Sequence, residues 1–520
     1  MMAPTRKFPI GIQDFEKIRT GNYLYIDKTE QIYRLATEGS YYFLSRPRRF
    51  GKSLLITTLK ALFLGKRELF KGLAIDGKDD WDWAVHPVLH LDLNTNKYDQ
   101  AEVLEHKLDE SLNVWESEYG CPRPDLPFGM RFEKVIEQAY KQTGQRVVIL
   151  VDEYDKPMLQ AIGNPELQEE YRGTLKAFYG ALKSMDGCIK FAMLTGVTKF
   201  GKVSVFSDLN NLLDISLSRE YYDVCGITEE ELLTNFKEEI DTLAEQNGMT
   251  REECITHLRK MYDGYHFEET APGVYNPFSL LNTFKSNKFG SYWFETGTPT
   301  YLVTLLRESD YNLNQMAHVD VTADVLNSID PGSANPIPVI YQSGYLTIKG
   351  YDTRFKEYHL GFPNEEVEEG FVKFLAPFYT SRERSRSAFD IRNFIKDVET
   401  GNPEQFLLRL KTLFASAPYE SKMDSENNYQ NIVWVVFKMM GFYSHTEYHT
   451  SDGRIDLLVE TPLYRYVMEF KLDGTAEEAL QQIHDKDYPL QFSLDDKQTW
   501  LIGVNFSHDT RTIEKYIIEK

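Results

Sequence analysis

The stretch Arg46-Pro47-Arg48-Arg49-Phe50-Gly51-Lys52-Ser53 decides the fold of this chain. An aromatic and aliphatic run at residues 41–44 precedes it, and a helical pattern from residue 54 to residue 64 follows it. A strand, a Gly-Lys-Ser turn and a helix in this order are typical of a phosphate-binding loop, because the N–H groups that open the helix must face the anion. Arg46 occupies the position of the first glycine in G-x-x-x-x-G-K-[ST], so the motif is degenerate.

A second element downstream supports a nucleotide site. The run Val147-Val148-Ile149-Leu150-Val151-Asp152-Glu153 places apolar, mostly β-branched residues before two carboxylates. This pattern is typical of a strand buried on both faces, and an open α/β sheet binds its ligands at the carboxyl ends of its strands. A core strand with a solvated acidic tip would explain Asp152 and Glu153 alone, but it would not explain two motifs in the correct order.

The polar residues of these motifs receive separate predicted roles. We expect Lys52 to reach the β- and γ-phosphates of a nucleotide and Glu153 to polarise the attacking water, while Ser53 and Asp152 hold Mg²⁺. Thr195 ends another buried strand, at residues 188–196, where it either senses the nucleotide or simply closes the strand. The predicted nucleotide-binding residues are Arg48, Arg49, Phe50, Gly51, Lys52, Ser53, Asp152 and Thr195. Candidates for an arginine finger are Arg48, Arg49 and Arg219.

Composition limits the class of protein. Of the 520 residues, 42% are hydrophobic and 13% aromatic, which is enough to form packed cores. The chain is too long to fold around a single core, so several domains are expected. The formal net charge of −21 argues against binding of nucleic acid by bulk electrostatics, so DNA or RNA would need a local groove. Four cysteines without a C-x-x-C pair and the lack of a long apolar run predict a cytoplasmic protein with reduced thiols and no membrane contact. Homo-oligomerisation stays open.

The predicted fold class is α/β. Strands separated by helices indicate a P-loop parallel sheet over residues 1–225. Residues 226–380 have helical patterns at 229–245 and 321–329, then a hairpin, which together fit a winged-helix-like module that binds DNA in some proteins and packs in others. A charged linker is expected at 381–387, and residues 381–520 form the last α/β domain.

Two further boundaries come from local patterns. Residues 203–215 are rich in Asn and Asp and predict a loop, and the helical stretch 391–413 leads into the last domain. Near the start of the chain, Asp27 or Thr29 is expected to cap a helix, and this segment is a candidate for lining a base pocket.

The last domain holds a second group of polar residues. Residues 453–460 and 465–472 are predicted to pair as antiparallel strands, and alternation would put Glu469 and Lys471 on one face with Met468 and Phe470 in the core. This pairing can bring Asp456 beside them. Carboxylates that hold Mg²⁺ next to a lysine are the groups that metal-dependent phosphodiester cleavage needs. The candidate catalytic residues are Asp456, Glu469, Lys471, Glu426 and Gln482, with Asp456 and Glu469 as metal ligands.

Two observations oppose this second site. An exposed edge strand with an intrastrand ion pair would explain Glu469 and Lys471 alone. Residues 421–520 carry 10 Lys and Arg against 17 Asp and Glu, a net charge of −7, which is unusual for a domain that binds a polyanion.

The chain resembles a bacterial architecture that joins an AAA-ATPase-like domain to a C-terminal domain of the PD-(D/E)XK nuclease superfamily. The motifs that carry the first resemblance are Pro9-Ile10-Gly11-Ile12-Gln13-Asp14-Phe15, Tyr25-Ile26-Asp27-Lys28-Thr29, the loop 46–53, Val151-Asp152-Glu153-Tyr154-Asp155-Lys156-Pro157 and Thr195-Gly196-Val197-Thr198-Lys199-Phe200. Those that carry the second are Glu426, Gly453-Arg454-Ile455-Asp456, Glu469-Phe470-Lys471, Gln482 and Tyr488.

This resemblance implies functions for both halves. It implies that Lys52, Ser53 and Asp152 bind MgATP with Glu153 as the catalytic acid-base residue, and that the loop with Arg46 is an ordinary form of the motif. It also implies a nuclease core of Asp456, Glu469 and Lys471 supported by Glu426 and Gln482, although Ile455 replaces the proline of the nuclease motif. The alternative is a regulatory ATP-binding interaction protein whose nuclease fold is silent. A nucleotide kinase is a third interpretation, without an apparent second phosphate pocket.

Overall fold

A computed structural model describes most of the chain as two compact units. One unit comprises Met1–Thr296 with His318–Glu366, and the other comprises Gly297–Ala317 with Val367–Lys520. The described residues are 7–94, 96–199, 211–294, 302–303, 305–306, 309–317, 319–327, 329, 335–380, 384–415, 426–441, 447–449, 457–485, 497–507, 509–510 and 512–520.

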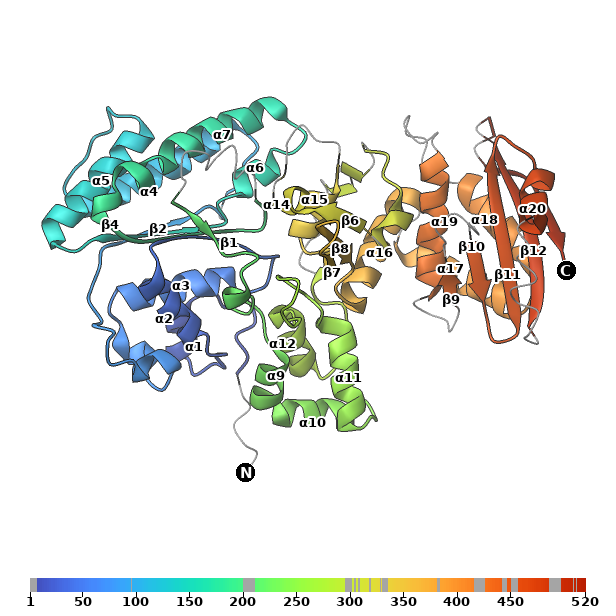
Figure 1. Cartoon of the computed structure of the whole chain (residues 1–520), viewed down its shortest axis with the longest axis horizontal. Helices are drawn as coiled ribbons and strands as arrows, with labels where there is room; N and C mark the ends of the chain where they lie inside the picture. Colours follow the sequence, from blue (N-terminus) through green and yellow to red (C-terminus); the bar gives the residue numbers. More distant parts are fainter. Residues whose placement is uncertain are drawn as a thin grey trace. The chain divides into compact units, whose positions relative to one another are not determined.

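The first unit is built on a parallel five-stranded sheet, as the sequence predicts (Figure 1). Its strand order is β2-β3-β4-β1-β5, so β4 lies between the strand before the Gly-Lys-Ser turn and the strand with the acidic tip. The strands are β1 (Tyr41–Ser45), β2 (Val88–Asp92), β3 (Val147–Asp152), β4 (Ile189–Gly196) and β5 (Leu213–Asp214). Short β5 corrects part of the loop expected at 203–215, because Leu213 and Asp214 pair with β1; residues 200–210 lie outside the described part.

Helices cover both faces of this sheet (Figure 1). One face carries α1 (Phe15–Thr20), α2 (Thr29–Glu38) and α3 (Lys52–Phe63), and the other carries α4 (Ala101–Glu118), α5 (Phe128–Thr143) and α7 (Pro165–Tyr179). Every residue of β3 is buried, which explains its uninterrupted apolar run. The prediction of an α/β fold with a P-loop parallel sheet is therefore confirmed.

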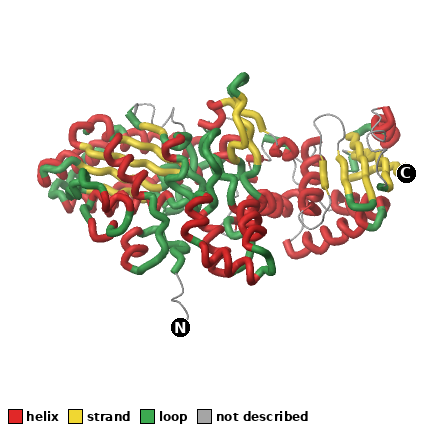
Figure 2. Tube along the Cα trace, turned by 60° about the horizontal axis from the view of Figure 1, so that its bottom comes forward, coloured by secondary structure: helices red, strands yellow, loops and turns green. Residues whose placement is uncertain are grey.

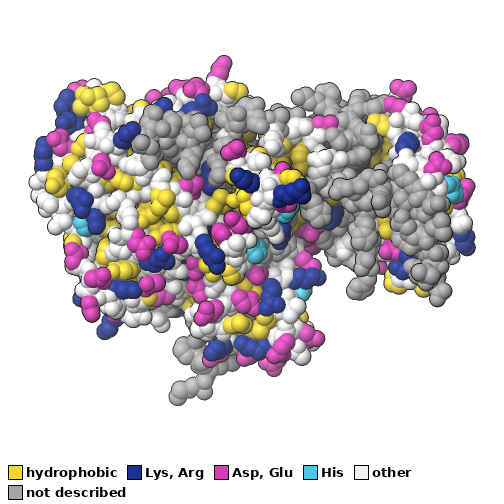
Figure 3. All heavy atoms as spheres, viewed as in Figure 1, with side chains coloured by type: hydrophobic (Ala, Val, Ile, Leu, Met, Phe, Trp, Pro, Cys, Tyr) yellow, Lys and Arg dark blue, Asp and Glu magenta, His cyan; other side chains and the backbone are white. Residues whose placement is uncertain are grey.

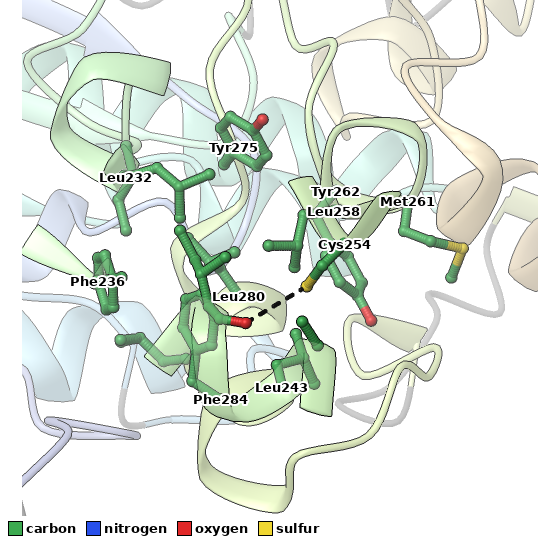
Figure 4. Packing of buried hydrophobic residues seen from close by; sticks show 14 of the residues in the cluster. Leu232, Phe236, Leu243, Cys254, Leu258, Met261, Tyr262, Tyr275, Leu280 and Phe284 are labelled. Carbon is green, nitrogen blue, oxygen red and sulfur yellow. Dashed lines mark hydrogen bonds between the residues drawn. The ribbon is translucent and has the colours of Figure 1, made fainter. Parts of the chain in front are cut away.

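A helical region follows the sheet and has its own core (Figure 4). It contains α9 (Glu229–Asn235), α10 (Lys237–Gln246), α11 (Arg251–Tyr262) and α12 (Pro277–Ser286). The single helix expected at 229–245 is wrong, because the chain breaks at Phe236. That ring is fully buried and stacks on Phe284 with centroids 4.9 Å apart. Tertiary packing thus overrides a continuous helical pattern.

A three-stranded antiparallel sheet completes the first unit. Its order is β6-β8-β7, with β6 (Val319–Thr322), β7 (Thr347–Asp352) and β8 (Glu357–Gly361). Helices α14 (Ala323–Asn327) and α15 (Ile337–Gln342) connect β6 to β7. The helix expected at 321–329 is present as α14 at 323–327, but its start is wrong, because residues 321 and 322 belong to β6 and pair with β8. Figure 2 shows these strands standing clear of the neighbouring helices.

The second unit contains a mixed sheet in the order β13-β12-β11-β10-β9. Its strands are β9 (Glu447–His449), β10 (Leu457–Glu460), β11 (Tyr464–Leu472), β12 (Gln498–Ser507) and β13 (Thr512–Glu519). Its helices include α17 (Arg384–Glu399), α18 (Pro403–Ala415), α19 (Glu426–Gly441) and α20 (Ala476–Asp485), preceded by α16 (Glu365–Thr380).

Two expectations about this unit need correction. The linker expected at 381–387 is wrong from Arg384 onward, because α17 begins there; residues 381–383 lie outside the described part. The helical stretch expected at 391–413 is split into α17 and α18, since Gly401 adopts φ 72°, which ends a right-handed helix.

All four cysteines are free thiols. Among the described residues, no helix combines the length and the apolar character that a bilayer crossing requires.

Candidate functional site: a nucleotide-binding edge

The phosphate-binding loop begins helix α3 with a glycine in the left-handed region. Gly51 has φ 98°, and a Cβ there would be strained whatever the space around it. Lys52 follows as the first helical residue and is only 3% exposed. Its Nζ donates to the carbonyls of Arg46 at 3.1 Å and Pro47 at 3.3 Å, so the loop curls around the ammonium group.

The strand order brings the remaining polar residues to the same edge. Thr195, at the end of β4, donates from Oγ1 to Asp152 Oδ1 at 2.7 Å. Burial raises the pKa of Asp152, and hydrogen bonds from Ser53 and Thr195 partly offset the rise. A carboxylate that is buried in this way is stabilised when a cation binds beside it.

These groups fit a magnesium ion. Mg²⁺ in nucleotide sites takes one or two protein oxygens together with phosphate oxygens and water, and Ser53 and Asp152 offer such oxygens. Among the described residues, no three His, Cys, Asp or Glu side chains are grouped for a metal.

Glu153 lies at the same edge in a strained conformation. Its φ is 52°, a left-handed value that is uncommon outside glycine, asparagine and aspartate. The Glu153 carboxylate lies 3.4 Å from Lys52 Nζ. The structure therefore brings Lys52, Asp152, Glu153 and Thr195 together.

Arg46 acts as an internal brace of the loop. Its guanidinium is 1% exposed and donates to the carbonyls of Ser45, Ser216 and Tyr221 at 2.7–3.1 Å. It also lies 3.9 Å from the centroid of the Phe267 ring, and burial lowers its pKa to about 10. A glycine at this position would leave the carbonyls of Ser45 and Ser216 without this donor, while the Tyr221 carbonyl would keep the Val224 N–H at 3.3 Å.

Replacing Arg46 by the glycine of the ordinary motif should therefore destabilise the protein. We expect Arg46→Gly to lower the free energy of unfolding by about 3 kcal/mol or more, because each unpaired buried carbonyl costs about 1–3 kcal/mol. The thermal unfolding midpoint measures this loss. Arg48→Gly, in the same loop but exposed, controls for the added flexibility. Equal midpoints for the two variants would contradict the bracing role.

The other loop residues have different surroundings. Phe50 is buried and packs edge-on against Tyr265, with centroids 4.7 Å apart. Arg49 has φ 69° and stacks on Phe278 at 4.9 Å. Arg48 and Arg219 are exposed.

A pocket of about 650 Å³ adjoins Gly51 and the start of α3. It is mostly apolar, and the segment before the first strand contributes Pro9, residues 24–26 and Lys28. The sequence prediction missed the opposite wall, which consists of Cys225, Gly226, Ile227, Pro277 and Leu281. No local motif marks this wall.

An ion pair links the two walls of the pocket. Lys28 Nζ lies 2.6 Å from the carboxylate of Glu231 in α9, and both side chains are largely buried. The cap expected from Asp27 or Thr29 is wrong, because Lys28 occupies the N-cap position of α2; Asp27 instead accepts from the Thr29 N–H at 2.8 Å. The pocket has the apolar walls and the position that a nucleobase needs beside a phosphate loop.

The C-terminal sheet holds part of the second predicted site. Glu469 is 1% exposed, and its Oε2 accepts from Gln482 Nε2 at 3.2 Å. Lys471 Nζ donates to Gln482 Oε1, so one amide joins both side chains. Glu426 begins α19, and only its backbone is described. Asp456 lies outside the described residues, next to Leu457, which pairs with Met468.

Two expectations about β11 are corrected. The expected alternation puts Phe470 in the core and Glu469 on the other face, but Glu469 is buried and Phe470 only half-buried. The reason is that α20 packs over the face that carries Glu469. The edge-strand alternative also fails, since β11 lies in the middle of its sheet and Lys471 pairs with Gln482.

Comparison with known proteins gives matches at both ends of the chain. Residues 9–206 match the family model described as a predicted AAA-ATPase, and residues 424–516 match the PD-(D/E)XK nuclease superfamily. An uncharacterized protein in the vnfD 5′ region of Azotobacter chroococcum mcd 1 is 38% identical over 527 residues, which cover 99% of each chain.

Among solved structures, the Aeropyrum pernix ORC2 protein in ADPNP and ADP complexes aligns over 65% of this chain and 87% of its own. The identity is 11% and the TM-score is 0.25, a likeness too weak to support a functional comparison. The match to the Azotobacter protein extends over both units, and the two family models match the residues that carry both candidate sites. The chain therefore belongs, with that protein, to the family that joins an AAA-ATPase-like domain to a C-terminal PD-(D/E)XK nuclease superfamily domain.

Proposed function

We propose that the first unit binds MgATP and hydrolyses it. The observation that carries this proposal is the meeting of Lys52, Asp152, Glu153 and Thr195 at one edge of a parallel sheet, beside an apolar pocket. The phosphates would lie against the N–H groups that open α3, where the helix dipole favours an anion. The base would enter the pocket lined by Leu24, Ile26 and Ile227.

Each residue has one task in this mechanism. When the nucleotide binds, Lys52 Nζ gives up its hydrogen bonds to the loop carbonyls and donates to the β- and γ-phosphate oxygens. There it stabilises the negative charge that develops during transfer. Glu153 orients and polarises the attacking water, and Thr195 fixes the Asp152 carboxylate through its hydrogen bond. Mg²⁺ held by Ser53 and Asp152 would neutralise phosphate charge.

Glutamine at position 153 should separate binding from hydrolysis. We expect Glu153→Gln to bind MgATP with an unchanged Kd and to lose hydrolysis by roughly 100-fold or more, because the amide cannot act as a base. Titration calorimetry and phosphate release measure the two steps. Glu166→Gln, at an exposed position in the first turn of α7, is the matched control. Hydrolysis at the wild-type rate in Glu153→Gln would assign the base to another residue.

The phosphate loop also contacts the parts of the unit that follow the sheet. Trp293 Nε1 donates to the Arg48 carbonyl at 3.1 Å, and the Lys199 N–H donates to Gln342 Oε1 at 2.7 Å. Gly344 adopts φ 90° directly against Pro47. These contacts, all within the first unit, support a shift of the helical and winged region with nucleotide occupancy. We propose in addition that this shift gates the C-terminal domain.

For the C-terminal unit we propose metal-dependent cleavage of nucleic acid by Asp456, Glu469 and Lys471, with Glu426 and Gln482 in support. The buried Glu469 and its bridge through Gln482 to Lys471 favour this proposal. On the face drawn in Figure 3, basic and acidic side chains are interspersed. Whether DNA or RNA is the substrate is decided by assay on both.

The alternative function is a regulatory ATP-binding interaction protein with a silent nuclease fold. The net charge of −7 over residues 421–520 favours this alternative. Titration with ATP and Mg²⁺, followed by a plasmid-nicking assay on the same sample, distinguishes the two: uptake of nucleotide without nicking supports the interaction protein, and nicking that Asp456→Ala abolishes supports the nuclease.

A further inference from the structure

Asp155 is a buried carboxylate to which the mechanism above gives no task. It follows Glu153 by two residues and is completely buried. Its Oδ2 accepts three hydrogen bonds, from the Val197 N–H at 3.1 Å, the Thr198 N–H at 2.6 Å and the Thr198 hydroxyl. All three donors belong to the segment that leaves β4 directly after Thr195.

Tyr154 adds two bonds between the same segments. Its N–H donates to the Thr195 carbonyl at 3.0 Å, and its hydroxyl donates to the Thr198 carbonyl at 2.9 Å. Gly196 permits this close approach, because a Cβ at that position would lie 2.6 Å from Asp155 Oδ1 and 2.7 Å from the Tyr154 ring. The residues that follow Glu153 are thus joined to those that follow Thr195 by five hydrogen bonds.

The joined segments determine where Glu153 lies. A left-handed φ costs a residue such as glutamate about 1–2 kcal/mol, and it persists only where the surrounding structure holds it. The hydrogen bonds of Asp155 and Tyr154 fix the backbone that follows Glu153, while Lys52 contacts the Glu153 carboxylate. Hydrogen bonds to an ionised acceptor are roughly twice as strong as bonds between neutral groups, so the charge of Asp155 strengthens its bonds to Val197 and Thr198.

We propose that Asp155 is a positioning residue for ATP hydrolysis, which keeps Glu153 at a fixed place relative to Thr195 and Lys52. This inference rests on the proposed function. It assigns Asp155 to the hydrolytic step and not to nucleotide binding, because neither the phosphate loop nor the base pocket includes it. A carboxylate that only held the fold together would affect stability and binding without a selective effect on turnover.

The test compares Asp155→Asn with Thr198→Val and Thr198→Ser in the full-length protein. Asparagine keeps the shape and one acceptor oxygen but removes the charge, valine removes one of the three donors, and serine restores it. We expect kcat for ATP hydrolysis to fall roughly 10- to 100-fold in Asp155→Asn, the loss expected when a catalytic group is slightly misplaced. The fall in Thr198→Val should be smaller, and Thr198→Ser should have wild-type kcat. The Kd for MgATP should be unchanged in all three.

The outcomes separate this inference from the proposed function. A wild-type kcat in Asp155→Asn, or a fall in kcat matched by weaker MgATP binding and a lower unfolding midpoint, would refute the positioning role while leaving the ATPase in place. A wild-type protein that binds MgATP without hydrolysing it would refute the hydrolytic function itself, and the positioning role with it.

Discussion

Lys52→Ala is expected to abolish nucleotide binding. Lys52 is the buried cation at the centre of the phosphate loop, and the variant leaves the Glu153 carboxylate and two loop carbonyls without their partner. Losing one member of a buried, hydrogen-bonded charge pair costs about 2–5 kcal/mol, which corresponds to a Kd roughly 30- to 5,000-fold higher. Calorimetric titration with ATP and Mg²⁺ measures this change directly.

Lys60→Ala, on the same helix, is the matched control and should bind ATP as the wild type does. A cooperative unfolding transition that begins well above the assay temperature shows that the Lys52 variant is folded. Retention of nucleotide by folded Lys52→Ala would contradict the proposed site. The same variant tests gating, because nucleic-acid cleavage that is identical in both proteins under ATP would argue against coupling between the units.

Glu469→Gln is expected to eliminate metal-dependent cleavage by the second unit. A glutamine of the same shape keeps an oxygen that can accept from Gln482, so the sheet should stay folded. The charge that would hold a metal disappears, and we expect a loss of roughly 100-fold or more in the cleavage rate. Nicking of plasmid DNA and degradation of single-stranded RNA in Mg²⁺ measure this rate.

Asp485→Asn, an exposed carboxylate at the end of α20, is the control and should cleave normally. ATP hydrolysis by Glu469→Gln should stay at the wild-type rate, because the substituted residue belongs to the other compact unit. Residual cleavage that Glu469→Gln leaves unchanged would indicate a contaminating nuclease or a different site. A wild-type protein without cleavage would favour the interaction protein.

Sequence patterns predicted the centre of the parallel sheet well because β1, β3 and β4 are buried on both faces. The continuous apolar residues of β3 and the residues around Gly51 leave few other structures for these segments. Patterns failed where long-range packing competes with a local preference. Phe236 breaks a continuous helical pattern because its ring enters the core beside Phe284. The sequence pattern assigns the last two residues of β6 to the helix that follows them, because a strand of four residues is too short to establish a period.

The sequence by itself determined the α/β class of the first unit and the order of the candidate motifs along the chain: the Gly-Lys-Ser turn, the acidic strand end, and the later Glu-x-Lys strand. Only the tertiary structure decided what surrounds them. It inserted β4 between β1 and β3, so that Thr195 reaches Asp152, and it joined Lys28, which lines the apolar pocket, to Glu231 across 203 positions. The physical reason is that local patterns record burial and backbone preference, whereas contacts between distant segments depend on how whole elements pack.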